Sequence, residues 1–303
     1  MNLLIMAGML LLVRFTIFLP VFSQNGLEGL MPGWMFLLLI LATVFIGAGG
    51  YVINDVLDIE MDRINKPGKQ VIGKQISEAA GNKLHFNLTA AGVVIGLVFS
   101  YLSGNLVSGV IFIIIPTALF YYSYKYKYMP VIGNLVVALL AAMVILVCWI
   151  FEFYHLKTNP DLFIEASLLF PQILRFILAF AFFAFMTTFT REIAKDAQDV
   201  TGDQRFGCRT IPVVLGFHKT GYLIFILNIL IIITLGWFQY YLYISGYKEM
   251  VYALVITQLL LVYAGLKAIG AKEKSSWGKI STLMKLVMIA GMLSLLTVYL
   301  RSF

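Results

Sequence analysis

The sequence predicts an all-α polytopic membrane protein with nine transmembrane helices, and two observations support this. Of the 303 residues, 61% are hydrophobic and only 12% are charged, whereas a soluble domain averages about 25% charged residues. The apolar residues gather into nine segments, and runs of roughly 17–25 such residues suit a helix that crosses a bilayer. We expect these helices at approximately 3–22, 33–53, 84–102, 106–123, 131–150, 172–190, 220–243, 247–268 and 281–300.

The first of these segments is expected to be a retained span and not a signal peptide. It lacks a basic region at its start, and Arg14 interrupts its apolar run. No polar or low-complexity linker is long enough to separate two folding units, so a single domain over 1–303 is expected. Cys148 lies in an apolar span and Cys208 in a polar stretch, which does not suggest a disulfide framework.

The loops between the predicted spans alternate in charge. Basic residues concentrate in the charged loops at 54–83, 124–130, 191–219 and 269–280, and they are sparse in the short or charge-poor loops at 23–32, 103–105, 151–171 and 244–246. The positive-inside rule places the first set in the cytoplasm, with the N-terminus inside and the C-terminus outside. The net charge of +7 is thus explained by membrane topology and not by nucleic acid, and an integral protein of the cell membrane is expected.

Three aspartates follow the second predicted span. Asp55, Asp58 and Asp62 are spaced i, i+3 and i+7, which on a helix places all three carboxylates on one face over about two turns. Like charges on one face repel, so we expect a cation between them. Asn54 adds a neutral oxygen ligand or a hydrogen bond that orients a ligand, whereas Glu60 falls off this face and is expected to be a solvated charge.

The same spacing recurs after the sixth predicted span, at Asp196, Asp199 and Asp203. Gly202 weakens a helix, so this second motif is expected to straddle a helix end. The topology places both motifs on one membrane face, which favours a single shared site. Carboxylates are the ligands that Mg²⁺ prefers, and Mg²⁺ commonly bridges carboxylates to substrate phosphates. We therefore predict that the six aspartates are metal-binding and catalytic, in an enzyme that removes a diphosphate from a lipid.

A diphosphate also needs cationic donors from the protein. For each candidate the alternative is a basic residue that serves only membrane topology. The candidates are Arg63, Lys66, Lys69, Lys125 and Lys195.

Two polar residues inside predicted spans are candidates for binding the acceptor. A charge within a span is costly and usually faces a cavity, so Arg14 binds an acidic acceptor or phosphate, or it extends to the cytoplasmic interface. Asn134 is a buried polar group that needs a partner.

These residues resemble the UbiA superfamily of intramembrane prenyltransferases over the whole chain. The first motif has the form NDxxDxxxD and the second the form DxxDxxxD, and the second most resembles members that act as geranylgeranylglycerol-phosphate geranylgeranyltransferases. Further similar tracts are 62–67, 122–125, 133–134, 191–203, 206–207 and 210–212.

The resemblance implies a helical bundle around a central cavity that opens laterally to lipid. It also implies that Mg²⁺ on the two motifs binds a polyprenyl diphosphate, whose ionisation gives an allylic cation that an acceptor attacks. The best interpretation of the acceptor is geranylgeranylglyceryl phosphate. The alternatives are an aromatic quinone precursor, such as 4-hydroxybenzoate or dihydroxynaphthoate, and a haem.

Two other classes of function remain open at this point. A cation transporter usually has its site near the bilayer midplane, whereas these acids lie at span ends and the span interiors are nearly free of carboxylates. A transferase that moves a phosphoalcohol between lipids would also use clustered aspartates and Mg²⁺. Two well-separated clusters favour the prenyltransferase over both.

Overall fold

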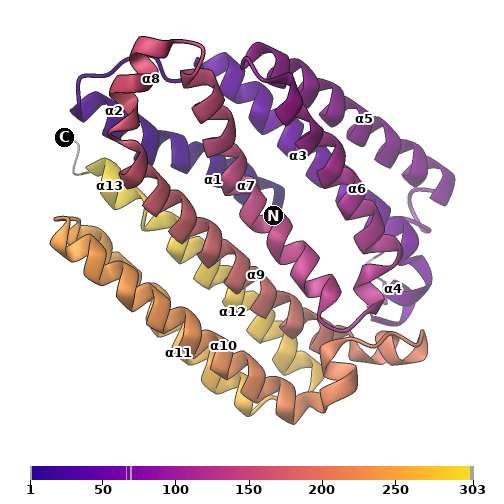
Figure 1. The fold of residues 1–303 in the computed structure, drawn as a ribbon. Helices are drawn as coiled ribbons and strands as arrows, with labels where there is room; N and C mark the ends of the chain where they lie inside the picture. Colours follow the sequence, from indigo (N-terminus) through magenta and orange to yellow (C-terminus); the bar gives the residue numbers. More distant parts are fainter. Residues whose placement is uncertain (1, 66, 69, 301–303) are drawn as a thin grey trace. The chain divides into compact units, whose positions relative to one another are not determined.

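The computed structural model describes residues 2–65, 67–68 and 70–300, and the regular secondary structure of the described chain is helical (Figure 1). No strand occurs within these ranges. The α-helices are α1 (Asn2–Leu12), α2 (Leu19–Gln24), α3 (Gly33–Leu57), α4 (Ile59–Asn65), α5 (Glu78–Leu102), α6 (Ile111–Tyr124), α7 (Ile132–Leu156), α8 (Pro160–Ser167), α9 (Phe170–Arg205), α10 (Ile211–Ile244), α11 (Lys248–Ile269), α12 (Lys274–Leu293) and α13 (Leu296–Leu300). Shorter helical turns are a π-helix at Val13–Phe18 and 3₁₀ turns at Leu106–Val110 and Tyr126–Tyr128.

The nine predicted spans are confirmed. In the described part of the chain, nine helical segments are long and apolar enough to cross a membrane. Several are longer than their apolar cores; α9, for example, continues 15 residues beyond the predicted end at 190, through the polar stretch to Arg205. Hydrophobicity marks the part of a helix that meets lipid, whereas backbone hydrogen bonding sets where the helix ends.

The chain divides into two compact units. The first unit comprises Met1–Tyr124 and Met143–Leu178, and the second comprises Lys125–Ala142 and Ala179–Phe303. The boundaries fall within or beside helices, inside α7 and α9 in particular, and not in a flexible linker. The first aspartate motif belongs to the first unit and the second motif to the second unit.

In the first unit, α3 packs against α5, α6 and α1. Close approach of α3 and α5 depends on small residues, as is common between membrane helices. A Cβ added to Gly92 of α5 would lie 3.0 Å from the backbone nitrogen of Ile46 and 3.1 Å from the carbonyl oxygen of Ala42. The buried rings of Phe99 and Phe151 pack with centroids 4.8 Å apart, which adds an aromatic contact between α5 and α7.

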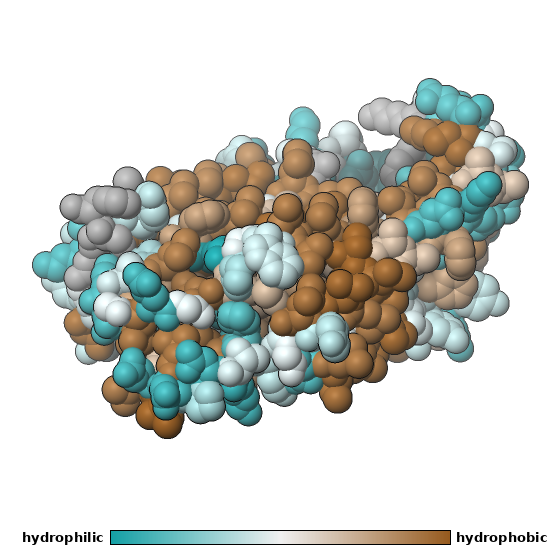
Figure 2. All heavy atoms as spheres, turned by 90° about the horizontal axis from the view of Figure 1, so that it is seen from above, coloured by the Kyte–Doolittle hydropathy of each residue, from teal (hydrophilic) through white to brown (hydrophobic). Residues whose placement is uncertain are grey.

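In the second unit, α11 packs between α10 and α12. Polar side chains join α10 to α11: the amide of Asn228 donates to the carbonyl oxygen of Leu261 at 3.0 Å, and Gln258 donates to Gln239 at 2.7 Å. Such hydrogen bonds hold membrane helices together where burial from water cannot. Hydrophobic side chains cover much of the face that Figure 2 shows, as a lipid-exposed surface requires.

Candidate active site

The first motif sits at a break between two helices. α3 ends at Leu57, Asp58 takes a non-helical conformation (φ −98°, ψ 6°), and α4 begins at Ile59. The prediction of one continuous helical face for Asp55, Asp58 and Asp62 is therefore wrong. Helical hydrogen bonding nevertheless continues on each side, because the Asp58 N–H donates to the Asn54 carbonyl oxygen at 3.0 Å and the Asp62 N–H donates to the Asp58 carbonyl oxygen at 2.7 Å.

Neighbouring side chains orient the carboxylate of Asp58. The amide of Asn54 donates to Asp58 Oδ2 at 2.9 Å, and the hydroxyl of Ser123 from α6 donates to Asn54 Oδ1 at 3.5 Å. Asp58 is buried, whereas Asp55 is exposed. Asn54 thus takes the second of its two predicted roles in this structure, that of orienting an aspartate.

The second motif lies on one unbroken helix. α9 carries Asp196, Asp199 and Asp203 and ends two residues later at Arg205, so the predicted helix end within the motif is wrong. Gly202 is tolerated inside the helix because its cost, about 1 kcal/mol relative to alanine, is small beside the packing of α9. That packing buries Ile193, Ala194 and Ala197 in a core with Trp277 of α12, which determines the rotation of α9 about its axis.

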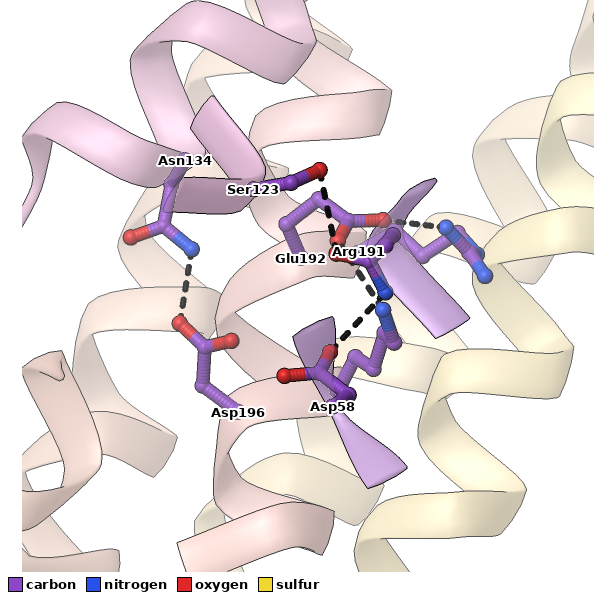
Figure 3. Close-up of polar contacts among 8 residues, drawn as sticks. Asp58, Ser123, Asn134, Arg191, Glu192 and Asp196 are labelled. Carbon is purple, nitrogen blue, oxygen red and sulfur yellow. Dashed lines mark hydrogen bonds and ion pairs between the residues drawn. The ribbon is translucent and has the colours of Figure 1, made fainter. Parts of the chain in front are cut away.

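Asp196 is held by a residue distant in sequence. The amide of Asn134, in the first turn of α7, donates to Asp196 Oδ2 at 2.7 Å (Figure 3). Asp203, which is buried, accepts a hydrogen bond from the Thr210 hydroxyl at 3.1 Å. Thr210 is the N-cap residue of α10 but makes no side-chain cap, because its hydroxyl is directed to Asp203 instead.

The predicted diphosphate ligands lie in differing surroundings. Arg63 is exposed and forms an ion pair with Glu60 at 2.8 Å, and Lys125 is exposed at the start of the Tyr126–Tyr128 turn. Lys195, in α9, lies 3.8 Å from Glu192 Oε2. Lys66 and Lys69 lie outside the described residues.

Arg14 lies at the end of α3 that is opposite to the first motif. It is buried, and its Nη2 donates to the carbonyl oxygen of Met31 at 2.6 Å, two residues before α3 begins. The 25 residues of α3 cover about 37 Å at 1.5 Å per residue. Arg14 therefore lies far from Asp58, at the other end of α3, and its acceptor role stays a prediction.

The donor atoms of both motifs suit Mg²⁺, which binds carboxylate and amide oxygens. Within residues 2–65, 67–68 and 70–300, no three His, Cys, Asp or Glu side chains are already gathered around one point. Asn54 and Asn134 each hold one carboxylate through a neutral amide, which orients that carboxylate without neutralising its charge. The chemistry of the ligands therefore fits the predicted metal.

Comparison with known proteins gives a consistent result. A sequence model of the UbiA prenyltransferase family matches residues 5–289. The chain belongs to this family. It is 31% identical over 253 residues to the digeranylgeranylglyceryl phosphate synthase of Methanosphaera stadtmanae, an alignment that covers 83% of each chain.

Solved structures of UbiA proteins share the fold. A structure of a digeranylgeranylglyceryl phosphate synthase in membranes has a TM-score of 0.59 at 23% identity, over 99% of this chain and 98% of that one. A UbiA homologue from Archaeoglobus fulgidus, bound to GPP and Mg²⁺, has a TM-score of 0.52 at 16% identity, over 97% and 99%. The family match and the nine apolar helices of the described residues make the chain an integral membrane prenyltransferase, and the cation transporter is rejected.

Two residues beside the second motif, Thr210 and Glu192, lie in tracts that resemble the family but were given no role from the sequence. The spacing of the motif gave no role to Thr210, because its bond to Asp203 depends on the path of the chain after α9. Glu192 gave a signal that was overlooked: it lies four residues before Asp196, so it continues the spacing of the second motif by one turn.

The contact between Asn134 and Asp196 leads to a prediction. Replacing Asn134 by alanine removes the amide that orients this carboxylate, and the loss of such a partner typically costs about 10–100-fold in metal affinity or activity. We expect a loss of prenyl transfer in this range, partly restored by raising the Mg²⁺ concentration. Asn87→Ala, at an exposed position of α5, is the control. Unchanged activity in Asn134→Ala would show that Asp196 needs no such support.

Proposed function

We propose that this UbiA family enzyme transfers a geranylgeranyl group from geranylgeranyl diphosphate to geranylgeranylglyceryl phosphate. The observation that carries this proposal is the alignment, over 83% of both chains, with a relative named digeranylgeranylglyceryl phosphate synthase. In the reaction, the bond between the allylic carbon and the diphosphate oxygen breaks and the diphosphate leaves with the electron pair. An acceptor hydroxyl then bonds to that carbon and releases its proton.

The six aspartates of the two motifs are proposed to bind Mg²⁺ and, with it, the diphosphate. Bound Mg²⁺ would stabilise the negative charge that develops on the leaving group. Asn54 and Asn134 hold Asp58 and Asp196 in fixed orientations, and Thr210 holds Asp203. Fixed carboxylates reduce the reorganisation that binding a diphosphate would otherwise require.

Basic residues complete the proposed diphosphate site. Lys195 lies one residue before Asp196 on α9, so its ammonium is available within one turn of the second motif. Arg63, Lys66, Lys69 and Lys125 are proposed in the same role on the basis of their positions in sequence. With the basic loops in the cytoplasm, the enzyme would take its diphosphate from that side of the cell membrane.

The test is a transfer assay with purified protein and radiolabelled geranylgeranyl diphosphate, with and without Mg²⁺. Geranylgeranylglyceryl phosphate, 4-hydroxybenzoate and 1,4-dihydroxy-2-naphthoate would be offered separately. We expect a Mg²⁺-dependent product with geranylgeranylglyceryl phosphate and none when EDTA replaces the metal. A product with an aromatic acceptor alone would reject the proposed acceptor and keep the prenyl transfer.

A further inference from the structure

Glu192 extends the row of acids on α9 by one turn toward the apolar part of the helix. Glu192, Asp196, Asp199 and Asp203 follow at intervals of four, three and four residues, which places them along one side of the helix. The side chain of Glu192 is 6% exposed. A buried charge is costly unless it is paired, so the partners of Glu192 matter.

The surroundings of Glu192 differ from those of the aspartates beside it. Its Oε1 forms an ion pair with the guanidinium of Arg191 (Figure 3), and its Oε2 lies 3.8 Å from the ammonium of Lys195. Lys285 of α12 also interacts electrostatically with Glu192. Asp196, by contrast, is held by the neutral amide of Asn134.

This difference separates the two kinds of acid. The three cations offset the negative charge of Glu192, so this carboxylate is a poor metal ligand. Glu192 and the three cations together carry a net positive charge. Two of these cations differ in accessibility: the side chain of Arg191 is 12% exposed and that of Lys195 is 35% exposed. Glu192 therefore contacts Lys195 from the buried side, and the ammonium of Lys195 is exposed enough to contact an anion as well.

We propose that Glu192 is a positioning residue that holds the Lys195 ammonium beside the second motif, so that the ammonium binds the diphosphate of the substrate. Glu192 acts through Lys195 and does not itself bind metal. The proposal rests on the proposed function, in that the anion is the diphosphate leaving group. An ammonium fixed in place loses less side-chain entropy on binding than a free one, which is the gain that Glu192 provides.

The test compares Glu192→Gln with the unaltered enzyme in the transfer assay. One charge-assisted contact is worth roughly a tenfold change in affinity. We therefore expect KM for the prenyl diphosphate to rise about tenfold, with kcat and the half-saturating Mg²⁺ concentration unchanged. Glu192→Asp, which keeps the charge, should recover part of the affinity. Glu249→Gln, an exposed acid at the start of α11, is the matched control and should behave as the unaltered enzyme.

A double-mutant comparison shows whether Glu192 acts through Lys195. Lys195→Met should raise KM by a similar factor, and the double variant should raise it no further, because both changes remove the same contact. Multiplied effects in the double variant would overturn the proposal, as would a rise in the half-saturating Mg²⁺ concentration with KM unchanged. If Glu192→Gln does not fold, Glu192→Met, which also removes the charge at a similar volume, replaces it in the same comparison.

Binding of inorganic diphosphate separates this proposal from the choice of acceptor. Calorimetry in the presence of Mg²⁺ measures its Kd without any transfer, so the result stands even if every acceptor is wrong. We expect Glu192→Gln and Lys195→Met to weaken this binding by the same factor, about tenfold. Equal Kd values for the variants and the unaltered protein would overturn the proposal.

Discussion

Asp199→Asn is expected to reduce prenyl transfer by at least about a hundredfold, the loss typical when one group that stabilises charge in a transition state is removed. The amide has the same shape as the carboxylate but lacks its charge, so binding of a divalent cation is weakened while packing is preserved. The measurement is the rate of radiolabel transfer at saturating Mg²⁺. Asp58→Asn, in the first motif, should give a loss of the same order.

The folded state of these variants should not suffer. Removing one of several like charges on α9 relieves repulsion, so the thermal unfolding temperature in detergent should equal or exceed that of the unaltered protein. Asp161→Asn, an exposed acid in the first turn of α8, is the matched control. Full activity in Asp199→Asn or Asp58→Asn would refute the metal-binding role of that motif.

Glu152→Ala is expected to cause the largest loss of stability. Glu152 of α7 is buried, and its Oε1 accepts the Met31 N–H at 2.7 Å, while Arg14 donates to the carbonyl oxygen of the same residue. The variant removes the carboxylate that interacts electrostatically with the buried Arg14 and leaves the Met31 N–H without its acceptor. Breaking a buried pair in this way typically costs about 3–5 kcal/mol, which thermal or denaturant unfolding in detergent would detect.

A double variant distinguishes charge from packing as the cause. Arg14→Met with Glu152→Met removes both charges and fills a similar volume, so it should unfold at a higher temperature than Glu152→Ala. If the double variant were the less stable, the Arg14–Met31–Glu152 contacts would themselves supply net stability. Both variants change residues at the end of α3 that is away from Asp58. The folded protein should therefore keep its prenyl transfer activity.

The sequence predicted the local features of this protein, and the helix boundaries that it predicted wrongly have a physical explanation. All nine spans were found because hydrophobic length is a property of contiguous residues. The end of α9 was placed too early because Gly202 and the polar residues around it lower helix propensity, and the packing of Ile193, Ala194 and Ala197 against Trp277 outweighs that cost. The break at Asp58 was missed because the i, i+3, i+7 spacing assumes an unbroken helix.

The candidate site was likewise predicted only in part. Both aspartate motifs and the metal they suggest follow from spacing and charge alone, as does the family resemblance that the comparison bears out. Arg14 was predicted to bind an acidic acceptor or phosphate, or to extend to the cytoplasmic interface, and in the structure its Nη2 donates to the backbone of Met31, 17 residues away. A sequence shows that such a charge needs a partner, but not which one.

The sequence by itself thus determined the fold class, the nine spans and the two motifs, because each depends on residues that are close together in the chain. Only the tertiary structure decided that Asn134 holds Asp196 across 62 residues, that Glu152 holds Met31 across 121, and that Lys285 approaches Glu192. These pairings arise from how the helices pack, and packing depends on the shapes of many side chains at once.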